Sequence, residues 1–367
     1  MSSQFALTPF IRRSLQSVLD PAVIDFWAAE LGMTTRWSRT MARVVARWME
    51  TPDTVTLVLK PNKHFTGFQA GQHVNLTVEI AGIRHTRSYS FSEAPSANGL
   101  IAITIKKVPN GRVSSFCVDQ LAVDDTVELG QAFGDMTIDS TTAANQKFLF
   151  LAAGSGVTPL MSLLRQLVQD KVAADTVLMF WVRTRQDLIF SKELLSLMEA
   201  NSHIRVVPIY EHETTLEAHE RSGRPSLEQF ADVVPDLNER NVYVCGPTGF
   251  MNAVQGMVAE QALAFHAEAF TPPVFVPTGD AATTVKLFLA KSNKTLEVPA
   301  GMPILDALEA QGVKPKSGCR MGICNTCACG KSNGATRNLL NNEVQLDDTT
   351  SLRICVNAAI GDLTLDL

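Results

Sequence analysis

The sequence predicts a multidomain chain made of an antiparallel β-barrel, an α/β domain with a parallel sheet and a small α+β domain, preceded by a short helical segment. Three observations support this prediction. Short strands punctuated by Gly and Pro come first, strands alternate with helices in the middle, and four cysteines with the spacing of a metal centre lie near the C-terminus. The 367 residues also suit two or three domains of roughly 100–200 residues each.

Residues 1–38 are predicted to form a helical extension, because their apolar residues recur at helical spacing on both sides of Pro21. We expect this extension to pack on the domain that follows it. Arginines gather at this end of the chain, so docking to a membrane or to a partner protein is the alternative interpretation.

Residues 39–142 have the pattern of a small antiparallel barrel, with little helical signal. Gly and Pro separate short runs that are rich in β-branched and aromatic residues. The strands are predicted at 41–48, 54–59, 73–79, 85–91, 101–108 and 126–129.

Residues 143–270 change to strand followed by helix, which is typical of a parallel sheet with helices on both faces. A proline-rich stretch at 271–283 then favours an extended linker, and 284–367 form the last domain. The strands of the two domains are predicted at 148–153, 177–182, 205–210, 241–245, 284–290 and 294–298, and their helices up to about 169 and at 190–200, 247–264 and 303–311.

Composition excludes several classes of protein. The formal net charge is −5 and no basic stripe is present, so we expect no nucleic-acid partner. No signal peptide is recognisable, and the longest apolar runs fall far short of the about 20 residues that cross a bilayer. Five of the seven cysteines lie in the last fifty residues, which is unlike a disulfide framework. We therefore expect a cytoplasmic protein without a transmembrane segment.

Three cysteines, Cys319, Cys324 and Cys327, have the spacing C-x4-C-x2-C, and Cys355 follows at a distance. This pattern supplies the four thiolates of a plant-type [2Fe-2S] cluster. A zinc site, a disulfide pair and buried apolar cysteines are the alternatives, but zinc sites usually pair their cysteines in two short C-x2-C clips. Cys329 falls outside the pattern and is expected to be a packed residue.

The barrel region contains the motif R-x-Y-S at Arg87, Ser88, Tyr89 and Ser90. The arginine can pair with a flavin phosphate, the tyrosine can lie against the isoalloxazine ring, and a serine can reach N5 of that ring. Taken alone the motif is weak, because any exposed strand could contain it.

A tight turn at Gly111 opens a short predicted helix that contains Val113 and Ser114. The start of such a helix presents free N–H groups and the positive end of the helix dipole to an anion, so a pyrophosphate fits there. A capped surface helix would have the same sequence pattern.

A glycine turn between a predicted strand and a predicted helix contains Gly154, Gly156, Thr158 and Pro159. This is the context of a dinucleotide phosphate site, although Pro159 replaces the third glycine of the usual fingerprint and no P-loop is present. Pro159 suits the first turn of a helix.

Cys245, Gly246 and Pro247 end another predicted strand of the same sheet. A thiol there would lie at the carboxyl edge of the sheet, where ligands of open α/β sheets bind. Read alone, Cys245 is more often a small buried residue than a functional thiol.

The order of these motifs on the predicted elements, beside the cysteine loop, makes the chain resemble ferredoxin reductase-like oxidoreductases fused to a C-terminal ferredoxin domain. The resemblance covers everything after about residue 40. It implies an FAD-binding barrel at 39–142, an NAD(P)-binding domain at 143–270, a linker at 271–283 and a β-grasp ferredoxin domain with the [2Fe-2S] cluster at 284–367. FAD, the cluster, and NADPH or NADH are the cofactors that it implies.

In such proteins NAD(P)H gives a hydride to the flavin, and the cluster accepts the electrons one at a time. By motif match, Ser90 and Cys245 would flank the hydride path as catalytic residues. The resemblance implies Arg87, Ser88, Tyr89, Ser90, Gly111, Val113 and Ser114 for FAD, Gly154, Gly156, Thr158, Pro159, Cys245, Gly246 and Pro247 for the nucleotide, and Cys319, Cys324, Cys327 and Cys355 for the metal cluster.

Six further residues are implied for the cofactors. Glu268 and Phe270 match the E-x-F ending of the nucleotide domain and would approach the ring. Arg183, Arg185 and Arg224 could meet the 2′-phosphate of NADPH, whereas Glu211 would repel it and could accept a ribose hydroxyl bond. The arginines favour NADPH and the glutamate favours NADH, and the sequence gives a slight preference to NADPH.

The start of the barrel, at 42–47, 54–62 and 67–74, together with 25–27, looks like the bacterial electron-transfer partners of membrane di-iron fatty acyl desaturases and alkane hydroxylases. The resemblance implies an electron-transfer reductase that is peripheral at the membrane through its acceptor. The reductase of a soluble aromatic-ring or phenylacetyl-CoA type oxygenase is the first alternative, and a redox-sensing module is the remote one.

Overall fold

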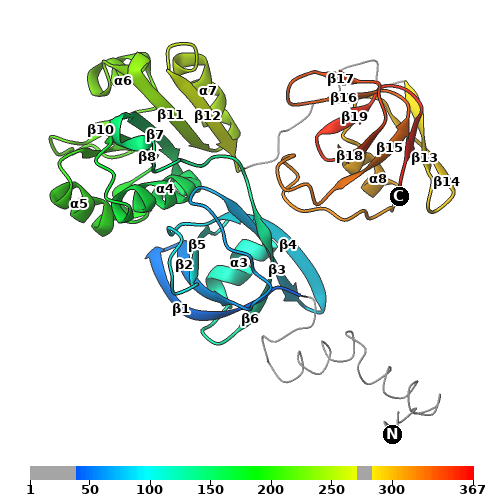
Figure 1. Ribbon diagram of the computed structural model, residues 1–367, viewed down its shortest axis with the longest axis horizontal. Helices are drawn as coiled ribbons and strands as arrows, with labels where there is room; N and C mark the ends of the chain where they lie inside the picture. The colour runs from blue at the N-terminus through cyan, green and yellow to red at the C-terminus, as the bar shows by residue number, and fades with distance from the viewer. Residues whose placement is uncertain (1–38, 271–282) are drawn as a thin grey trace, which may run out of the picture.

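The computed structural model describes residues 39–270 and 283–367, which form three domains (Figure 1). The predicted helical extension at 1–38 and nearly all of the predicted linker lie outside the described residues. Among the described residues, no helix combines the length and the apolar character needed to cross a membrane.

The first domain is an antiparallel sheet that closes on itself. Its strand order is β4-β3-β6-β1-β2-β5, and a bridge between Phe91 and Ile103 joins the two ends. Apolar side chains such as Val55, Leu57 and Leu59 fill its interior. The elements are β1 (Met41–Thr51), β2 (Thr54–Pro61), β3 (His73–Ile80), β4 (Ile83–Ser90), β5 (Ile101–Lys106), α3 (Arg112–Asp119) and β6 (Thr126–Phe133). The predicted barrel is thereby confirmed.

The second domain has a parallel sheet of order β10-β9-β8-β7-β11-β12. Helices α4 and α5 pack on one face, and α6 and α7 pack on the other. From β7 the chain first adds β8, β9 and β10 on one side of that strand and then adds β11 and β12 on its other side. The direction of winding therefore reverses between β7 and β11. Crevices at such reversals bind ligands beyond the carboxyl ends of the strands.

The strands of this domain are β7 (Lys147–Ala153), β8 (Asp175–Val182), β9 (Ile204–Tyr210), β10 (Arg221–Ser222), β11 (Arg240–Gly246) and β12 (Ala264–Ala269). Its helices are α4 (Val157–Gln169), α5 (Ser191–Ala200), α6 (Leu227–Val233) and α7 (Thr248–Val258), with short 3₁₀ turns at η1 (Ala143–Asn145), η2 (Gly154–Gly156), η3 (Arg185–Asp187) and η4 (Leu237–Glu239).

One predicted boundary in this domain is wrong. The helix expected at 247–264 ends at Val258, and β12 follows it. The amide of Leu263 donates to the carbonyl of Arg240 at 3.1 Å, which aligns the chain with β11 and starts six parallel pairings. Pairing with a neighbouring strand therefore overrides the local helical pattern.

The third domain packs α8 (Ile304–Ala310) on a mixed sheet of order β14-β13-β20-β15-β18, beside a small sheet of order β17-β16-β19. Its first hairpin and its helix agree with the prediction. The strands are β13 (Thr284–Leu289), β14 (Lys294–Pro299), β15 (Ala328–Asn333), β16 (Thr336–Asn338), β17 (Val344–Gln345), β18 (Thr349–Arg353), β19 (Asn357–Ala359) and β20 (Leu363–Leu365).

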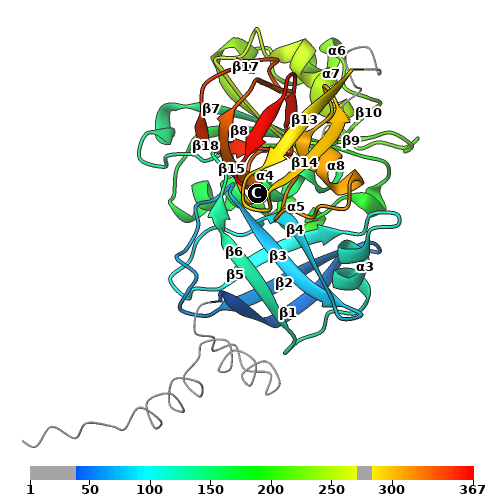
Figure 2. The same cartoon turned by 90° about the vertical axis from the view of Figure 1, so that its right-hand side faces the viewer.

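The loop that carries the first three cysteines, between α8 and β15, reaches toward the barrel (Figure 1). Figure 2 shows the third domain above the barrel and in front of the second domain. Asn75 of β3 donates from Nδ2 to Oγ1 of Thr326 in this loop at 3.0 Å. The barrel therefore contacts both of the other domains.

Candidate functional site

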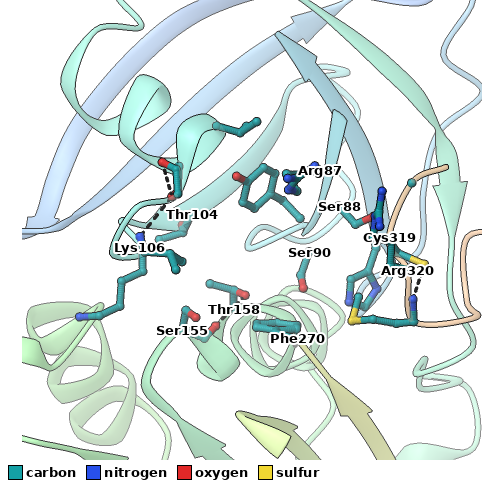
Figure 3. Close-up of a pocket in the computed structure, with 18 of the residues that line it drawn as sticks. Arg87, Ser88, Ser90, Thr104, Lys106, Ser155, Thr158, Phe270, Cys319 and Arg320 are labelled. Carbon is teal, nitrogen blue, oxygen red and sulfur yellow. Dashed lines mark hydrogen bonds between the residues drawn. The ribbon is translucent and has the colours of Figure 1, made fainter. Parts of the chain in front are cut away.

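A cavity of about 550 Å³ lies where the three domains meet (Figure 3). Cofactor sites of proteins usually span roughly 300–1,000 Å³, so its size suits a large organic ligand. The barrel contributes β4 and the start of α3, the second domain contributes the turn after β7, and the third contributes the cysteine loop. The lining includes His73, Arg87, Ser88, Tyr89, Ser90, Thr104, Lys106, Gly111, Val113, Ser114, Ser155, Thr158, Phe270, Gly318, Cys319, Arg320 and Met321.

All four residues of the R-x-Y-S motif line this cavity from β4. Figure 3 shows Arg87, Ser88 and Ser90 on the barrel side, and Cys319 and Arg320 on the cysteine loop. Arg87 is exposed and uses Nη1 for a 2.7 Å bond to the carbonyl of Thr86, so its other donors remain for a phosphate. Burial raises the pKa of Tyr89, which stays a neutral ring at physiological pH.

Arg87→Ala is expected to weaken flavin retention by about tenfold or more, because a charge-assisted bond to phosphate is lost. The flavin that remains with the protein after repeated ultrafiltration measures this. Arg84→Ala is the matched control, since Arg84 lies on the same strand but pairs with Glu128 at 2.6 Å and does not line the cavity. Equal flavin content in both variants would contradict the assignment of Arg87 to the flavin site.

The start of α3 supplies a place for an anion. A Cβ at Gly111 would come within 2.5 Å of the hydroxyl of Ser114 and 3.0 Å of the carbonyl of Val108, so this position needs glycine. The Ser114 hydroxyl accepts from the amide of Val108 at 3.1 Å, and no side chain caps the helix. The N–H groups of the first turn therefore stay available to a phosphate.

The glycine turn after β7 packs directly on the end of β11. Gly154 has a φ of +54°, and a Cβ at Gly156 would lie closer than 3.0 Å to the backbone of Cys245 and Gly246. Thr158 donates to the carbonyl of Ser155 at 3.0 Å, and both residues line the cavity. The turn thus brings the α4 N-terminus to the point where the strand order reverses, as a dinucleotide site requires.

Cys245 is not part of the cavity lining. Its side chain is fully buried at the end of β11, and burial raises the pKa of its thiol well above the usual value, with the charge of Glu268 adding to the effect. The thiol is therefore neutral. Gly246 follows it, where a Cβ would meet the ring of Phe250 at 2.9 Å, and Pro247 caps the start of α7.

A buried polar group joins the barrel to the second domain at one end of the cavity. His73 of β3 and Glu268 of β12 approach to 3.2 Å between Nε2 and Oε2, and their side chains are 2% and 11% exposed. Burial lowers the pKa of His73 to about 4 and, with the charge of Asp135, raises the pKa of Glu268 to about 8. Both groups are therefore neutral at pH 7, so the contact is not an ion pair.

Two buried polar atoms at this end, Nδ1 of His73 and Oγ of Ser90, have no hydrogen-bond partner, and the 3.2 Å contact of Oε2 of Glu268 with Nε2 of His73 lacks hydrogen-bond geometry. Buried polar atoms without partners are uncommon, and these can bond the polar atoms of a bound cofactor. Phe270 places its ring edge-on to His73, with centroids 6.1 Å apart. Unpaired polar atoms beside an aromatic ring suit the isoalloxazine ring of FAD. The free N–H groups at the start of α3, which also lines the cavity, suit its phosphates.

Glu268→Gln is expected to remove a pH dependence of stability. Between pH 4.5 and about 8 the unfolded chain ionises this glutamate while the folded chain keeps the proton, so the wild type loses stability as pH rises through this window. The unfolding temperature of Glu268→Gln should gain on the wild type by on the order of 5 °C between pH 5.5 and 8. Glu260→Gln, an exposed site in the same domain, should show no such gain. A constant difference across pH would contradict the burial of a protonated Glu268.

The four cysteine side chains form two pairs. Cys319 interacts with Cys324 and Cys355 with Cys327, and the neighbouring thiol lowers the pKa of Cys324 in the first pair and of Cys327 in the second. Backbone N–H groups also point at sulfur: the amides of Met321 and Cys324 lie 3.3 and 3.4 Å from Sγ of Cys319.

This pairing distinguishes a binuclear cluster from zinc. A tetrahedral zinc site with Zn–S of about 2.3 Å holds all four sulfurs about 3.8 Å apart. No three of these four described sulfurs lie within 4.8 Å of one another. Two thiolate pairs with N–H donors suit two irons, each held by two cysteines, so the residues present fit a [2Fe-2S] cluster. Cys329 is buried and packs in the domain core, as predicted.

Arg183, Glu211 and Arg224 lie outside the cavity, at exposed positions beyond adjacent strands of the second domain. The amide of His212 donates to the carbonyl of Arg183 at 3.0 Å, and the amide of Gly223 donates to the carbonyl of Tyr210 at 3.0 Å. The segments that follow β8, β9 and β10 therefore lie side by side. The structure therefore brings the three charges to one edge of the sheet, the edge that also holds the glycine turn.

His73 and Lys106 are among the lining residues that sequence reasoning missed. His73 stands in an ordinary strand start, and only its contact with Glu268 of another domain distinguishes it. Lys106 ends β5 and pairs with Asp53 at 2.9 Å and with Asp187 of the second domain at 3.3 Å. Neither residue carries a local signal, because both acquire their role from a partner far away in the sequence.

Comparison with known proteins gives three matches to family profiles. They are the oxidoreductase FAD-binding domain at 42–138, the oxidoreductase NAD-binding domain at 150–256 and the 2Fe-2S iron-sulfur cluster binding domain at 287–356. The chain is 31% identical to an NADPH oxidoreductase of Mycobacterium tuberculosis, over 89% of this chain and 83% of the relative.

Two further comparisons cover nearly the whole chain. A glycine betaine monooxygenase reductase subunit of Pseudomonas aeruginosa is 28% identical, over 95% of this chain and 98% of the relative. The solved structure of phthalate dioxygenase reductase has a TM-score of 0.56 at 23% identity and covers 89% of this chain and 97% of that one. The likeness to that structure concerns the fold.

Proposed function

Because this chain belongs to the ferredoxin reductase-like oxidoreductases that join FAD-binding, NAD-binding and [2Fe-2S] domains, we propose that it is the reductase of a membrane di-iron desaturase or hydroxylase. Members of this family carry electrons from NAD(P)H through FAD to the cluster and on to an oxygenase, and this chain does the same. The proposal adds the identity of the acceptor.

One observation carries the electron route. The R-x-Y-S strand of the barrel and residues 318–321 of the cysteine loop line the same cavity. A flavin held by Arg87 and the start of α3 would therefore adjoin the cluster ligand Cys319 without a separate protein between them. Bound FAD accepts a hydride and releases single electrons, which is the conversion that a cluster needs.

The residues of this chain position and shield the reactants. The backbone turn at Gly154 and Gly156 would bind nucleotide phosphate at the α4 N-terminus. Ser90 and the neutral thiol of Cys245 would flank the path of the hydride, with Phe270 excluding water from it. Glu268 would hold a proton at its carboxyl beside the ring, as its raised pKa allows. Arg183, Glu211 and Arg224 would select between NADPH and NADH.

The acceptor proposal rests on the sequence at 42–47, 54–62 and 67–74, together with 25–27, which resembles the electron-transfer partners of membrane fatty acyl desaturases and alkane hydroxylases. Such an acceptor would hold the reductase at the membrane surface. The test is reconstitution of purified reductase with membranes that contain a di-iron desaturase or hydroxylase, followed by NAD(P)H-dependent product formation. Turnover with the membranes supports the proposal. Turnover only with a soluble oxygenase would contradict it.

A soluble oxygenase is the second candidate acceptor, favoured by the Pseudomonas aeruginosa relative, which matches this chain over almost its full length. The same assay with a soluble oxygenase component in place of membranes separates the two candidates. The electron route inside the reductase is common to both, so it does not depend on this outcome.

A further inference from the structure

We propose that Asn75 and Thr326 form the contact that positions the cysteine loop for electron transfer from the barrel. Neither residue lines the cavity, so both act through their neighbours. The proposal rests on the electron route described above and adds a positioning device to it.

Asn75 lies at the centre of a three-residue chain of hydrogen bonds. Its Nδ2 donates to Oγ1 of Thr326 at 3.0 Å, and its Oδ1 accepts from the hydroxyl of Ser88 at 2.6 Å. Ser88 belongs to the R-x-Y-S motif, and Thr326 lies between the cluster ligands Cys324 and Cys327. One amide therefore links the strand that lines the flavin side of the cavity to the loop that holds the cluster.

The surroundings of this amide are tightly packed. A Cβ at Gly318 would meet Sγ of Cys324 at 2.8 Å, Oγ1 of Thr326 at 2.9 Å and Nδ2 of Asn75 at 3.2 Å. The glycine thus lets the barrel amide, the threonine and a ligand sulfur meet at one point. A side chain at position 318 would separate the loop from the barrel.

Polar contacts between the third domain and the first two domains are sparse among the described residues. Among hydrogen bonds and ion pairs between described residues, the Asn75–Thr326 bond is the one that crosses from residues 39–270 to residues 283–367. Barrel and nucleotide domain, in contrast, share Lys106–Asp187 and Arg165–Ser92 among others. With few polar contacts, the third domain can exchange between a docked and an undocked position on the barrel. The loss of one hydrogen bond then lowers the fraction of molecules in the docked position.

This position matters because electron tunnelling slows steeply with distance. Each NAD(P)H supplies two electrons as a hydride, and the oxidised cluster accepts one of them at a time from the reduced flavin. Reduction of the flavin needs only the first two domains, whereas reduction of the cluster needs the docked loop. Loss of the Asn75 amide should therefore slow the second step and spare the first.

Asn75→Leu, of similar size but without the amide, tests the proposal in the holoprotein. Anaerobic stopped-flow mixing with excess NADPH or NADH should show flavin bleaching at the wild-type rate and cluster reduction slowed by about three- to tenfold, the effect of one lost hydrogen bond. Thr77→Val is the matched control, because Thr77 lies two residues along the same strand and bonds Thr86 at 2.7 Å within the barrel.

Two measurements separate loss of docking from damage to the cluster. Hydrogen–deuterium exchange of oxidised holoprotein should rise in residues 318–327 of Asn75→Leu and not in Thr77→Val, which reports docking without any turnover. Thr326→Val should slow cluster reduction as Asn75→Leu does, and Thr326→Ser, which keeps the hydroxyl, should restore it. Iron content is measured in each variant so that only proteins with a full cluster are compared.

Cluster reduction at the wild-type rate in Asn75→Leu, with unchanged exchange of the loop, would overturn the proposal. A shifted midpoint potential of the cluster with unchanged exchange would overturn it too, because the effect would then lie in the cluster's own surroundings. A wild-type protein whose cluster stays oxidised after the flavin is bleached would instead refute the electron route itself.

Discussion

Cys324→Ser is expected to reduce NAD(P)H-driven cytochrome c reduction by on the order of 100-fold or more while ferricyanide reduction survives. Cys324 is one of two thiols with a lowered pKa in the loop, and its Sγ accepts a hydrogen bond from the amide of Cys319 at 3.2 Å. Its loss leaves one of the two sulfur pairs with a single thiol, so the cluster cannot be held. Ferricyanide takes electrons from the flavin and does not need the cluster.

The two activities are measured in the same preparation, together with iron and flavin content. Cys329→Ser is the matched control, because Cys329 is buried two residues beyond Cys327 and contributes to neither sulfur pair. It should keep its iron and both activities. Equal loss of both activities in Cys324→Ser, or loss of iron in Cys329→Ser, would contradict the assignment of ligands.

Gly156→Ala is expected to abolish nucleotide-driven reduction of the flavin or to unfold the second domain at ambient temperature. The added Cβ would overlap the carbonyl of Cys245 and lie 2.7 Å from the amide nitrogen of Gly246. Both are backbone atoms of β11, which pairs with a strand on each side, and they cannot move aside as a side chain could. Overpacking of this kind costs about 1–3 kcal/mol or more, and any relief moves the turn that binds phosphate.

Affinity for NADPH and NADH, measured by calorimetry on folded protein, and the unfolding temperature check this expectation. Gly256→Ala is the control, since Gly256 lies in α7 of the same domain with open space around its Cα. Alanine in that helix should raise stability by up to about 1 kcal/mol. A Gly156→Ala protein with wild-type affinity and stability would contradict the close packing of the turn on β11.

Predictions that depend on neighbouring residues in the sequence agree with the structure better than those that depend on contacts between distant segments. The cysteine spacing, the R-x-Y-S strand and the glycine turn are local patterns, and the structure brings the whole R-x-Y-S motif, Thr158 of the turn and the ligand Cys319 to one cavity. The roles proposed for them remain predictions. The helix expected at 247–264 was too long because pairing with β11, a tertiary effect, ends it.

Contacts between domains could not be predicted. His73 and Glu268 are neutral, buried and adjacent only because a barrel strand meets a strand of the second sheet. The Asn75–Thr326 bond joins residues 251 positions apart, and nothing in either local sequence marks it. A single sequence records which side chains suit a local turn or strand, but not which distant side chains will complete them.

Anaerobic titration with NADPH or NADH, followed in one sample by visible absorbance and by electron paramagnetic resonance, tests the central claim most directly. The flavin bands should bleach and the paramagnetic signal of a reduced [2Fe-2S] cluster should then appear in proportion to the iron content. Bleached flavin without any iron signal, in protein that holds its full complement of iron, would contradict a relay from nucleotide through flavin to cluster within this chain.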